Sequence, residues 1–435
     1  MLKGQIGTMR NMKQKKVSPW WVFLAIGLGV VSGSLTGTKT GLFGITFYSI
    51  YDLFGTLFIK SLTLIIVPLV SASIITGIAR IGSEGKMGRL GLKTFGFYIS
   101  TTFLAVLTGL AFVNLINPGS DGLSQELSAK AGEFAHIQQQ LSSQKLNTIS
   151  DLLLQIVPSN ILHAMAEGQM LALIFFSLLF GYAITKIESH NSATLRSFWQ
   201  GIFQTMIHIT HMIMKVLPFG VFFLVAKVFA TTGFESLKSL LIFFITVILA
   251  LSFFTFIVMP IILKLVGRVN PLRHFKAMAP ALVTAFSTSS STATLPITLD
   301  CVEKRAGVSN RISSLVIPLG LSLNLAGSAL YECVAAMFVA QVYGIEISFM
   351  TQFLVVFLAL ITSLGVAGIP AGSLVAVIVI LKALGLPEES IGLFIAVDRL
   401  LDMCRTTVNV FSDSCCAVLV ARTEGEKEIL TKTKY

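Results

Sequence analysis

Five polar side chains near the end of the chain share one face of a predicted helix. The stretch DRLLDMCRTTVNVFSDS, residues 398–414, contains Asp398, Asp402, Arg405, Asn409 and Asp413 at offsets of 0, 4, 7, 11 and 15. At about 100° per residue, these positions fall within a stripe about 80° wide. Ionisable groups inside a membrane cost several kcal/mol unless they are paired or hydrated, and they usually mark a pathway for a substrate or ion. The stretch therefore predicts a functional site, because one structural ion pair would not account for the whole stripe.

The residue types in this stripe predict an acidic substrate that also carries an amino group. Arg405 stays charged and presents a planar fork that suits a carboxylate. Asp402, one turn earlier, can receive an ammonium group, and hydroxyl groups with backbone N–H groups can hold a second carboxylate. An acidic α-amino acid satisfies all three contacts. A C4-dicarboxylate would leave Asp402 without a partner, and Arg405 argues against a neutral amino acid; both substrates remain as alternatives.

The sequence around the stripe is that of an all-α polytopic membrane protein. Of the 435 residues, 54% are hydrophobic and 12% are charged, whereas a soluble domain carries roughly 25% charged residues. Crossing a bilayer takes roughly 18 to 20 apolar residues. Stretches near or above this length lie at about 17–36, 42–79, 95–116, 152–186, 198–230, 237–266, 312–342, 350–385 and 388–420.

The net charge of +11 is explained by membrane topology. Basic residues gather in both tails, around residues 80–93 and around residues 264–276, and the positive-inside rule places these segments in the cytoplasm. The long polar loop at 118–150 is expected outside. The location of the charge gives no reason to expect a nucleic-acid partner. The five cysteines form no CxxC motif, so neither a disulfide framework nor a zinc site is indicated, and no cofactor is expected.

Two segments in the last third are not ordinary membrane helices. FSTSSSTATLP, residues 286–296, is rich in hydroxyl side chains, and LGVAGIPAGS, residues 364–373, is rich in glycine. Irregular backbone at membrane depth is tolerated only where it is buried in protein or faces a wet cavity. Each segment therefore predicts the tip of a re-entrant helical hairpin. Each is followed by a helix with a polar interruption, and this repeated scheme suggests the inverted repeat of secondary transporters.

Two alternatives belong to other classes of protein. A basic residue at the midplane can favour anions, as in an anion channel, but three aspartates on the same stripe argue against a purely anion-selective pore. A membrane-embedded hydrolase with a serine nucleophile would need a nearby base, and no His or Lys lies on the stripe. We therefore expect a transporter and not an enzyme.

Four motifs, SSSTATLP, NLAG, GVAGIP and DRLLDMCRTTVNV, resemble in type and order those of the dicarboxylate/amino acid:cation symporter family, which includes glutamate transporters. The resemblance runs from about residue 156 to residue 424, and more weakly over the first helices. It implies eight transmembrane helices plus two re-entrant hairpins, an elevator mechanism and a homotrimer in the cell inner membrane with both termini cytoplasmic. The implied function is import of L-glutamate or L-aspartate coupled to protons, with sodium as a further candidate ion.

The resemblance also implies a division of the chain into a scaffold and a transport domain. Its parts are a cytoplasmic basic tail at 1–16, scaffold helices 1 and 2 at 17–80, transport-domain helix 3 at 89–117, an extracellular loop at 118–150, scaffold helices 4 and 5 at 151–230, a transport-domain core at 234–425 and a cytoplasmic tail at 426–435. The core holds helix 6, the serine-rich hairpin, helix 7, the glycine-rich hairpin and helix 8. The glycine-rich hairpin would act as the outer gate, through Gly365, Gly368, Pro370 and Gly372.

Functional residues are implied position by position. The implied substrate shell is Arg405, Asp402, Asn409, Thr406, Ser328, Ser290, Ser291, Val366, Ala367 and Gly368. The implied first sodium site is Gly320, Asn324, Asn409 and Asp413.

The chain departs from the family in the NLAG motif, where members that couple to several sodium ions usually read Asn-Met-Asp-Gly. Ala326 lacks the carboxylate that would join Thr101 and Thr102 in a third sodium site, and two neutral oxygens are a poor cage for sodium. The sequence therefore argues against this site. Glu332 matches a glutamate that resembles a proton carrier in the animal transporters. Because burial disfavours the charged form of a carboxyl group, we expect Glu332 to carry a proton.

Overall fold

The computed structural model describes residues 19–42, 44–81, 88–119, 157–167, 169–232, 235–343, 348–365 and 372–430. These residues are mainly helical, and their one small ladder pairs β1 (Gly41–Leu42) with β2 (Ile45–Thr46). The first helices are α2 (Pro19–Thr36), α3 (Phe47–Ile81), α4 (Gly88–Ile116), α8 (Ile161–Glu167), α9 (Met170–Ile184), α10 (Ser189–Met214) and α11 (Leu217–Thr232). They are followed by α12 (Glu235–Phe253), which continues through the π-helical η2 (Phe254–Val258) into α13 (Met259–Leu265).

The remaining helices hold the motifs found in the sequence. They are α14 (Pro271–Thr288), α15 (Ser291–Asp300), η3 (Cys301–Arg305), α16 (Asn310–Leu323), α17 (Ala326–Val342), α18 (Phe349–Gly365), α19 (Gly372–Ala383), η4 (Glu388–Leu393) and α20 (Ile395–Thr423). The polar loop predicted outside the membrane lies almost wholly outside the described residues.

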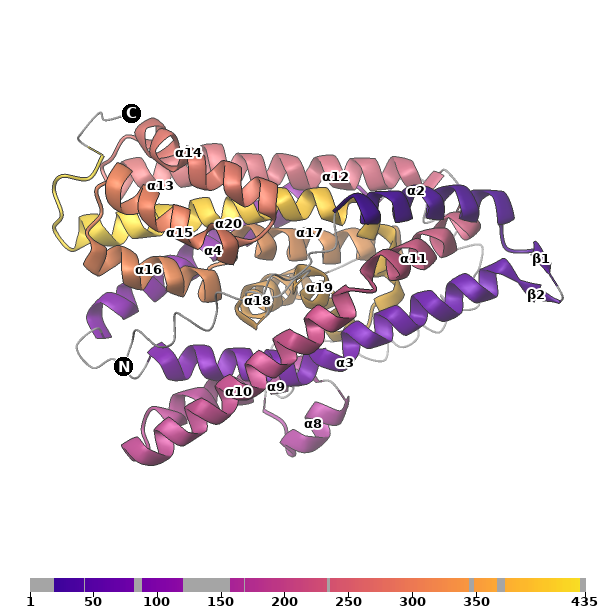
Figure 1. The fold of residues 1–435 in the computed structure, drawn as a ribbon, viewed down its shortest axis with the longest axis horizontal. Coiled ribbons are helices and arrows are strands. Elements are labelled where there is room, and N and C mark those ends of the chain that lie inside the picture. Colours follow the sequence, from indigo (N-terminus) through magenta and orange to yellow (C-terminus); the bar gives the residue numbers. More distant parts are fainter. Residues whose placement is uncertain are drawn as a thin grey trace.

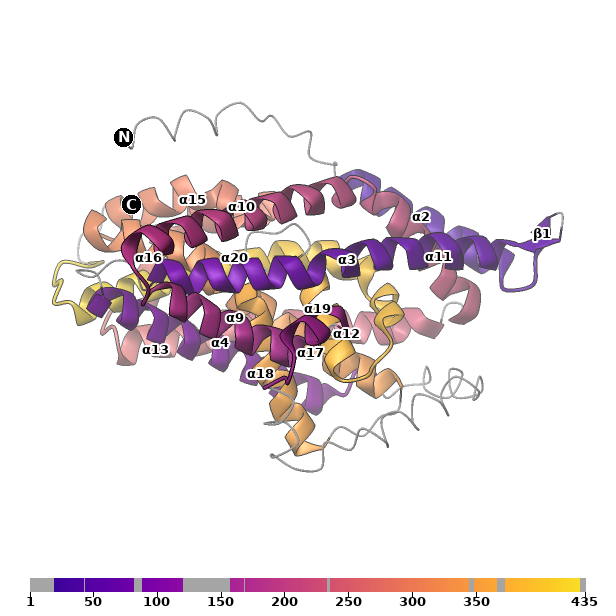
Figure 2. The ribbon, with the colours of Figure 1, turned by 90° about the horizontal axis from the view of Figure 1, so that it is seen from below.

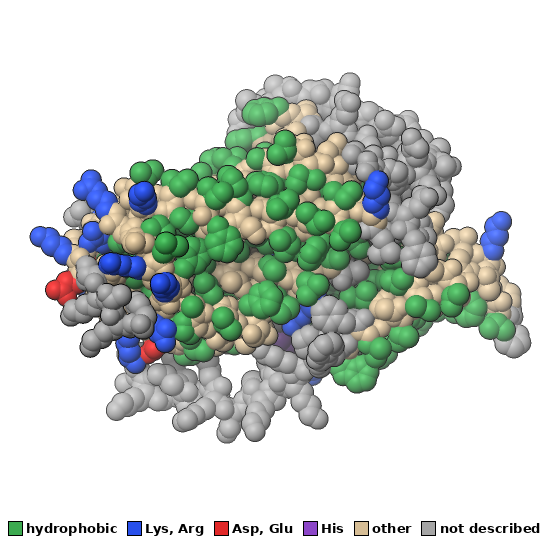
Figure 3. All heavy atoms as spheres, turned by 90° about the horizontal axis from the view of Figure 1, so that it is seen from above, with side chains coloured by type: hydrophobic (Ala, Val, Ile, Leu, Met, Phe, Trp, Pro, Cys, Tyr) green, Lys and Arg blue, Asp and Glu red, His purple; other side chains and the backbone are tan. Residues whose placement is uncertain are grey.

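Several of these helices are long and apolar enough to cross a membrane. Within the described part of the chain, four stretches meet this requirement by length and composition: Phe47–Ala79, Leu90–Ile116, Lys238–Leu265 and Asn310–Val342. Figure 3 shows apolar side chains over the middle of one face, with Lys and Arg gathered towards one end. An apolar band bordered by charge is the surface that a bilayer requires. The structure thus agrees with the predicted all-α membrane class.

One expected span is bent. The apolar stretch at 198–230 divides into α10 and α11, whose axes differ by 59°. Pro218 lies at the start of α11. Because proline has no N–H and its ring clashes with the carbonyl group four residues earlier, it ends a preceding helix and begins a new one. Hydropathy did not predict this break, because the stretch is apolar on both sides of it.

The helices pack mainly in two groups (Figures 1 and 2). The first group is α2, α3, α9, α10 and α11, and the second is α4 with the elements from α12 to α20. In the second group α20 contacts α4, α12, α14, α16 and α17. The polar face of α20 is thereby surrounded by protein.

Small residues let helices approach closely in both groups. In the first group, Gly29 and Gly33 of α2 lie against α11, where an added Cβ would meet the carbonyl oxygens of Phe222 and Ala226 at 2.9 and 2.4 Å. Spacing glycines by four residues in this way allows backbones to touch in a membrane protein, where packing rather than the hydrophobic effect drives helix association.

Local sequence explains the break between α14 and α15. Asn270 begins α14 by accepting a hydrogen bond from the backbone N–H of Leu272 at 2.9 Å, with Pro271 in the first turn. Ser289 ends α14 in the left-handed conformation, at φ 48°. Ser290 then caps α15 by accepting from the N–H of Ala293 at 3.2 Å. The serine-rich tip thus supplies the hydrogen bonds that the interrupted helix loses.

A second break separates α16 from α17 at Asn324 and Leu325, whose backbone angles are not helical. Gly327, at the start of α17, touches α20. A Cβ added there would lie 2.8 Å from the carbonyl oxygen of Arg405 and 3.0 Å from Cβ of Val408. The backbones of the broken helix and α20 therefore meet at Gly327.

We predict that Gly327→Ala destabilises the protein, because the new methyl group would overlap the α20 backbone. Overpacking of this kind costs about 1 to 3 kcal/mol, more than the gain of about 1 kcal/mol from replacing glycine in a helix. Thermal unfolding of the purified protein in detergent would measure the loss. Gly96→Ala in α4 is the matched control, since its Cβ would meet no atom within 4 Å. A Gly327→Ala protein that melts no lower than wild type would contradict the prediction.

Candidate functional site

The first half of α20 carries a row of paired charges. Arg405 Nη1 lies 2.9 Å from Asp398 Oδ1, and Nη2 lies 3.2 Å from Asp402 Oδ1. Arg399 Nη1 lies 3.6 Å from the other oxygen of Asp402, Oδ2. Two arginines and two aspartates therefore alternate in space in the order Arg399, Asp402, Arg405, Asp398. Their formal charges sum to zero, which is what makes charge tolerable in a protein interior.

Arg405 is also stacked on an aromatic ring. Its side chain is 1% exposed, and its guanidinium carbon lies 3.9 Å from the ring centroid of Tyr331 in α17. A cation over the face of an aromatic ring is attracted by the ring quadrupole, most strongly where water is excluded. Tyr331 is itself buried and makes edge contacts with Phe243 and Phe394. The guanidinium plane is thus fixed by two carboxylates and one ring.

A second polar cluster surrounds the break between α16 and α17. The Asn324 amide donates to Asp413 Oδ1 at 2.8 Å and to Ser412 Oγ at 3.1 Å. Its carbonyl oxygen accepts from Thr102 Oγ1 at 3.1 Å and from Thr101 Oγ1 at 3.4 Å. Asn324 therefore links α4, the broken helix and α20 with four hydrogen bonds. All of these side chains are buried.

Gly320 brings its helix against the same carboxylate. A Cβ added at Gly320 would lie 2.4 Å from Asp413 Oδ1, so any larger residue there would displace this carboxylate. The cluster presents the oxygen atoms of amide, hydroxyl and carboxylate groups, the ligands that hard cations such as sodium prefer.

Asn409 connects the two clusters. Its side-chain oxygen accepts from the backbone N–H of Gly327 at 2.8 Å and of Ser328 at 3.4 Å, and its amide donates to Ser328 Oγ at 3.2 Å. The first N–H groups of a helix have no partner within the helix. Asn409 satisfies two of them at the start of α17, one turn from Arg405 along α20.

The predicted hairpin residues are less closely tied to the charges. Thr406 is buried on α20, whereas Ser290 and Ser291 are half-buried. Helix α15 packs against α20, but among the described residues no hydrogen bond joins these serines to it. Gly365 ends α18 and Gly372 begins α19. Val366, Ala367, Gly368 and Pro370 lie outside the described residues.

Glu332 lies inside a helix that is buried on nearly every side. All residues of α17 except Gln341 are buried, and Glu332 is 0% exposed. The Thr362 hydroxyl donates to Glu332 Oε2 at 2.9 Å and also lies 2.8 Å from the carbonyl oxygen of Leu358. A hydroxyl group has one proton, so these two acceptors share it. Burial of Glu332, and not this hydrogen bond, is what disfavours its charged form.

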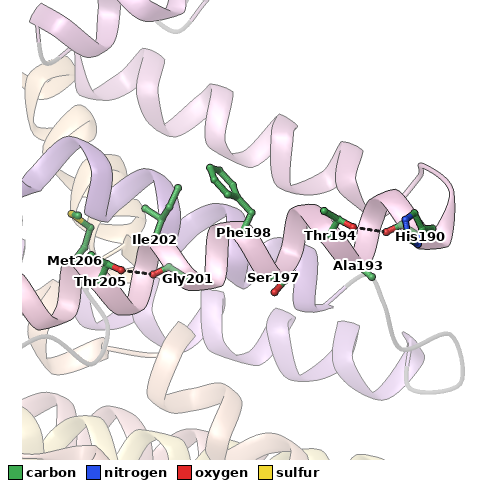
Figure 4. A pocket seen from close by; sticks show the side chains of 9 residues that line it. All are labelled: His190, Ala193, Thr194, Ser197, Phe198, Gly201, Ile202, Thr205 and Met206. Atoms are coloured by element: carbon green, nitrogen blue, oxygen red, sulfur yellow. Dashed lines mark hydrogen bonds between the residues drawn. The ribbon is translucent and has the colours of Figure 1, made fainter.

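A shallow hollow elsewhere on the protein does not involve these residues. It follows one face of α10 and is lined by side chains of that helix alone, among them His190, Phe198 and Met206 (Figure 4). None of the nine lining residues belongs to the polar clusters. The candidate site is thus the buried pair of clusters on α20.

Comparison with known proteins agrees with the motifs. The model of the sodium:dicarboxylate symporter family matches residues 19–423. The chain belongs to this family. It is 34% identical to the proton/sodium-glutamate symport protein of Bacillus caldotenax over 408 residues, 94% of each chain. It is 33% identical to the proton/glutamate-aspartate symporter of Escherichia coli (strain K12) over 417 residues, 96% of this chain and 94% of that protein. It is 32% identical to the human excitatory amino acid transporter 3 over 449 residues, 91% of this chain and 84% of that protein.

Family membership confirms the resemblance inferred from the four motifs. The family and these relatives are transporters, so the hydrolase alternative is rejected. The structure brings Arg405 to Asp402, Asn409 to Ser328, and Asn324 to Asp413 with Thr101 and Thr102. The roles of these residues in binding stay predictions.

Three contacts in the charged row were not predicted from the sequence: those of Arg405 with Asp398 and Tyr331, and that of Asp402 with Arg399. Asp398 was seen on the stripe, and its offset of seven from Arg405 could have suggested the ion pair. Arg399 lies outside the stripe, but it is three residues before Asp402, a spacing that brings side chains together on a helix, and this spacing could have suggested the contact. Tyr331 lies on another helix, far from Arg405 in the sequence, so no local pattern predicts their contact.

We predict that the ring of Tyr331, more than its hydroxyl group, stabilises the buried Arg405. Tyr331→Leu should lower the free energy of unfolding by about 2 kcal/mol or more, because a desolvated cation–π contact is lost. Tyr331→Phe keeps the ring and should stay within about 1 kcal/mol of wild type. Thermal unfolding in detergent measures both, and equal losses in the two variants would assign the effect to the hydroxyl group instead.

Proposed function

We propose that this member of the family is a secondary active symporter that imports L-glutamate or L-aspartate together with cations. The observation that carries the proposal is a buried guanidinium group, on Arg405, beside the carboxylate of Asp402. A planar cation next to an anion complements an acidic side chain next to an ammonium group. The relatives named as proton/sodium-glutamate and glutamate-aspartate symporters support the same substrate class.

Arg405 would bind the side-chain carboxylate of the substrate and Asp402 its ammonium group. Both residues are already paired with each other at 3.2 Å, so binding would exchange internal ion pairs for pairs with the substrate. Because a buried ion pair gains little net free energy over its desolvation cost, such an exchange is energetically feasible. The rest of the proposed substrate shell is Asn409, Thr406, Ser328, Ser290, Ser291, Val366, Ala367 and Gly368.

A proton is the first proposed coupling ion, and Glu332 its carrier. Its complete burial supports a neutral carboxyl group, because burial disfavours the charged form. Glu332 directly follows Tyr331 in the sequence, and Arg405 stacks on the Tyr331 ring, so the proposed carrier adjoins the proposed substrate site. Alternating access to the two sides of the membrane would let the group load and release a proton in each cycle.

Sodium is the second candidate ion, with Gly320, Asn324, Asn409 and Asp413 as proposed ligands. The proposal is supported by the burial of the Asp413 carboxylate beside Asn324, whose amide donates to it at 2.8 Å. We propose that the third sodium site of the family is lost. Thr101 and Thr102 donate to Asn324, and Ala326 offers no carboxylate to compete for their hydroxyl groups.

The architecture that we propose has eight membrane-spanning helices, two re-entrant hairpins and elevator motion. The turns at Ser289 and after Gly365 would be the hairpin tips, and Gly365, Gly368, Pro370 and Gly372 would form the outer gate. We propose that the first packing group belongs to the scaffold, at 17–80 and 151–230, and the second to the transport domain, at 89–117 and 234–425; the helix contacts support this division. We further propose a homotrimer whose termini are cytoplasmic.

Uptake into proteoliposomes tests the function directly. We expect labelled L-glutamate or L-aspartate to accumulate under an inward proton gradient in sodium-free buffer, and a protonophore to abolish the accumulation. Arg405→Lys keeps the charge but loses the fork, and it should lower the apparent affinity by about 30-fold or more. Accumulation only after sodium is added would make the Asn324 and Asp413 cluster an obligatory ion site. No accumulation with either ion would overturn the proposed function.

We predict that Glu332→Gln abolishes the pH dependence of uptake. Glutamine keeps the size and the neutral charge of the protonated side chain but can neither load nor release a proton. Initial rates would be measured as the external pH is lowered at fixed membrane potential. Glu303→Gln is the control, because Glu303 binds Asn310 and Ser313 near the ends of two helices, outside the buried clusters. If Glu332→Gln retains the wild-type pH profile, another group carries the proton.

A further inference from the structure

Asp402 has a second cationic partner. One of its oxygens accepts from Arg405 Nη2 at 3.2 Å, and the other lies 3.6 Å from Arg399 Nη1. Each oxygen of the carboxylate thus faces a different arginine. Asp402 would therefore keep a positive partner if Arg405 were recruited by the carboxylate of a substrate.

The two arginines are held very differently. Arg405 is 1% exposed, binds two aspartates and stacks on Tyr331, whereas Arg399 is 27% exposed and has one longer ion pair. Arg399 Nε is buried and has no hydrogen-bond partner among the described residues. The ion pair of a partly exposed, singly paired cation contributes little to stability. Arg399 is thus the member of the row that can leave its partner at the lowest cost.

Charge balance then depends on whether the substrate has an amino group. An acidic amino acid brings an ammonium group to Asp402, where it would take the place of Arg399. A dicarboxylate of the same length brings no cation to that position. Without Arg399, the second carboxylate of the dicarboxylate would lie near Asp402 with only Arg405 to neutralise both. Like charges at close range repel, so binding of the dicarboxylate would weaken. With Arg399 in place, Asp402 stays neutralised.

We propose that Arg399 is a specificity-determining residue that neutralises Asp402 whenever no ammonium group is bound. It lowers the discrimination between an acidic amino acid and the corresponding dicarboxylate. This alters the expectation from the sequence, in which a dicarboxylate leaves Asp402 without a partner. The inference rests on the proposed function, because it assumes that Arg405 and Asp402 bind the substrate.

Competition binding to the purified protein in lipid nanodiscs tests this role. Unlabelled L-aspartate and succinate, which differ only in the amino group, compete with labelled L-aspartate, and the ratio of their inhibition constants is the readout. In Arg399→Gln and Arg399→Met, we expect the ratio of succinate to aspartate to rise about threefold to tenfold. Succinate loses the neutralising cation, while aspartate no longer has to displace it. Using two variants guards against poor folding of one.

Two control variants separate specificity from general damage. Arg399→Lys keeps the charge and should leave the ratio near that of wild type. Lys227→Gln removes a different half-buried cation, which pairs with Asp52 at 2.7 Å in the other group of helices, and should not change the ratio. A ratio is independent of the amount of active protein, so a purely structural role of Arg399 would not move it.

The possible results separate failure of the role of Arg399 from failure of the proposed function. Wild-type binding of L-aspartate, with a ratio that rises only when the charge at position 399 is removed, would support the inference. Wild-type binding with an unchanged ratio in Arg399→Gln and Arg399→Met would overturn it and leave the proposed function standing. If wild type binds neither L-aspartate nor L-glutamate, the proposed function itself fails, and the inference fails with it.

Discussion

The burial of the Arg405 charge is the constraint on which the rest of the site depends. Transferring an ion of this kind out of water costs several kcal/mol even after the protein relaxes. Two carboxylates at 2.9 and 3.2 Å and an aromatic ring at 3.9 Å offset this cost. The carboxylates come from α20 itself, but the ring comes from α17, so the charge is tolerated only when these two helices touch. Gly327 allows the contact.

The broken helix follows from the same crossing. Bringing α17 onto α20 leaves the N–H groups of its first turn at membrane depth, where each unsatisfied group is costly. Asn409 binds two of them, and Asn324 uses its four hydrogen bonds to join the end of α16 to α4 and to Asp413. The two polar clusters therefore share one continuous helix, α20, and one interrupted helix. Asn409 lies between them on α20 and contacts the start of α17.

Much of this arrangement could be predicted from the sequence because it is local. A stripe on one helix is fixed by residue spacing, and serine-rich or Asn-containing interruptions reveal where helices stop, as at Ser289 and Asn324. Contacts between distant segments have no such signature. Tyr331 above Arg405, and the threonines of α4 on Asn324, depend on how helices pack. The bend before Pro218 was hidden for a different reason, since apolar composition continues through it and only the proline marks it.

The neutral row of charges explains how one site can be both stable and exchangeable. Two arginines and two aspartates cancel without any ligand, so the empty protein buries no net charge there. Under the proposed function, ligand groups of either sign would replace an internal partner of the same sign, and the number of ion pairs would be conserved. Because the outer pair, Arg399 with Asp402, is the longer and more exposed one, the proposed exchange would be easiest at that end. The deeply buried pair of Arg405 with Asp398 would hold the other end of the row in place.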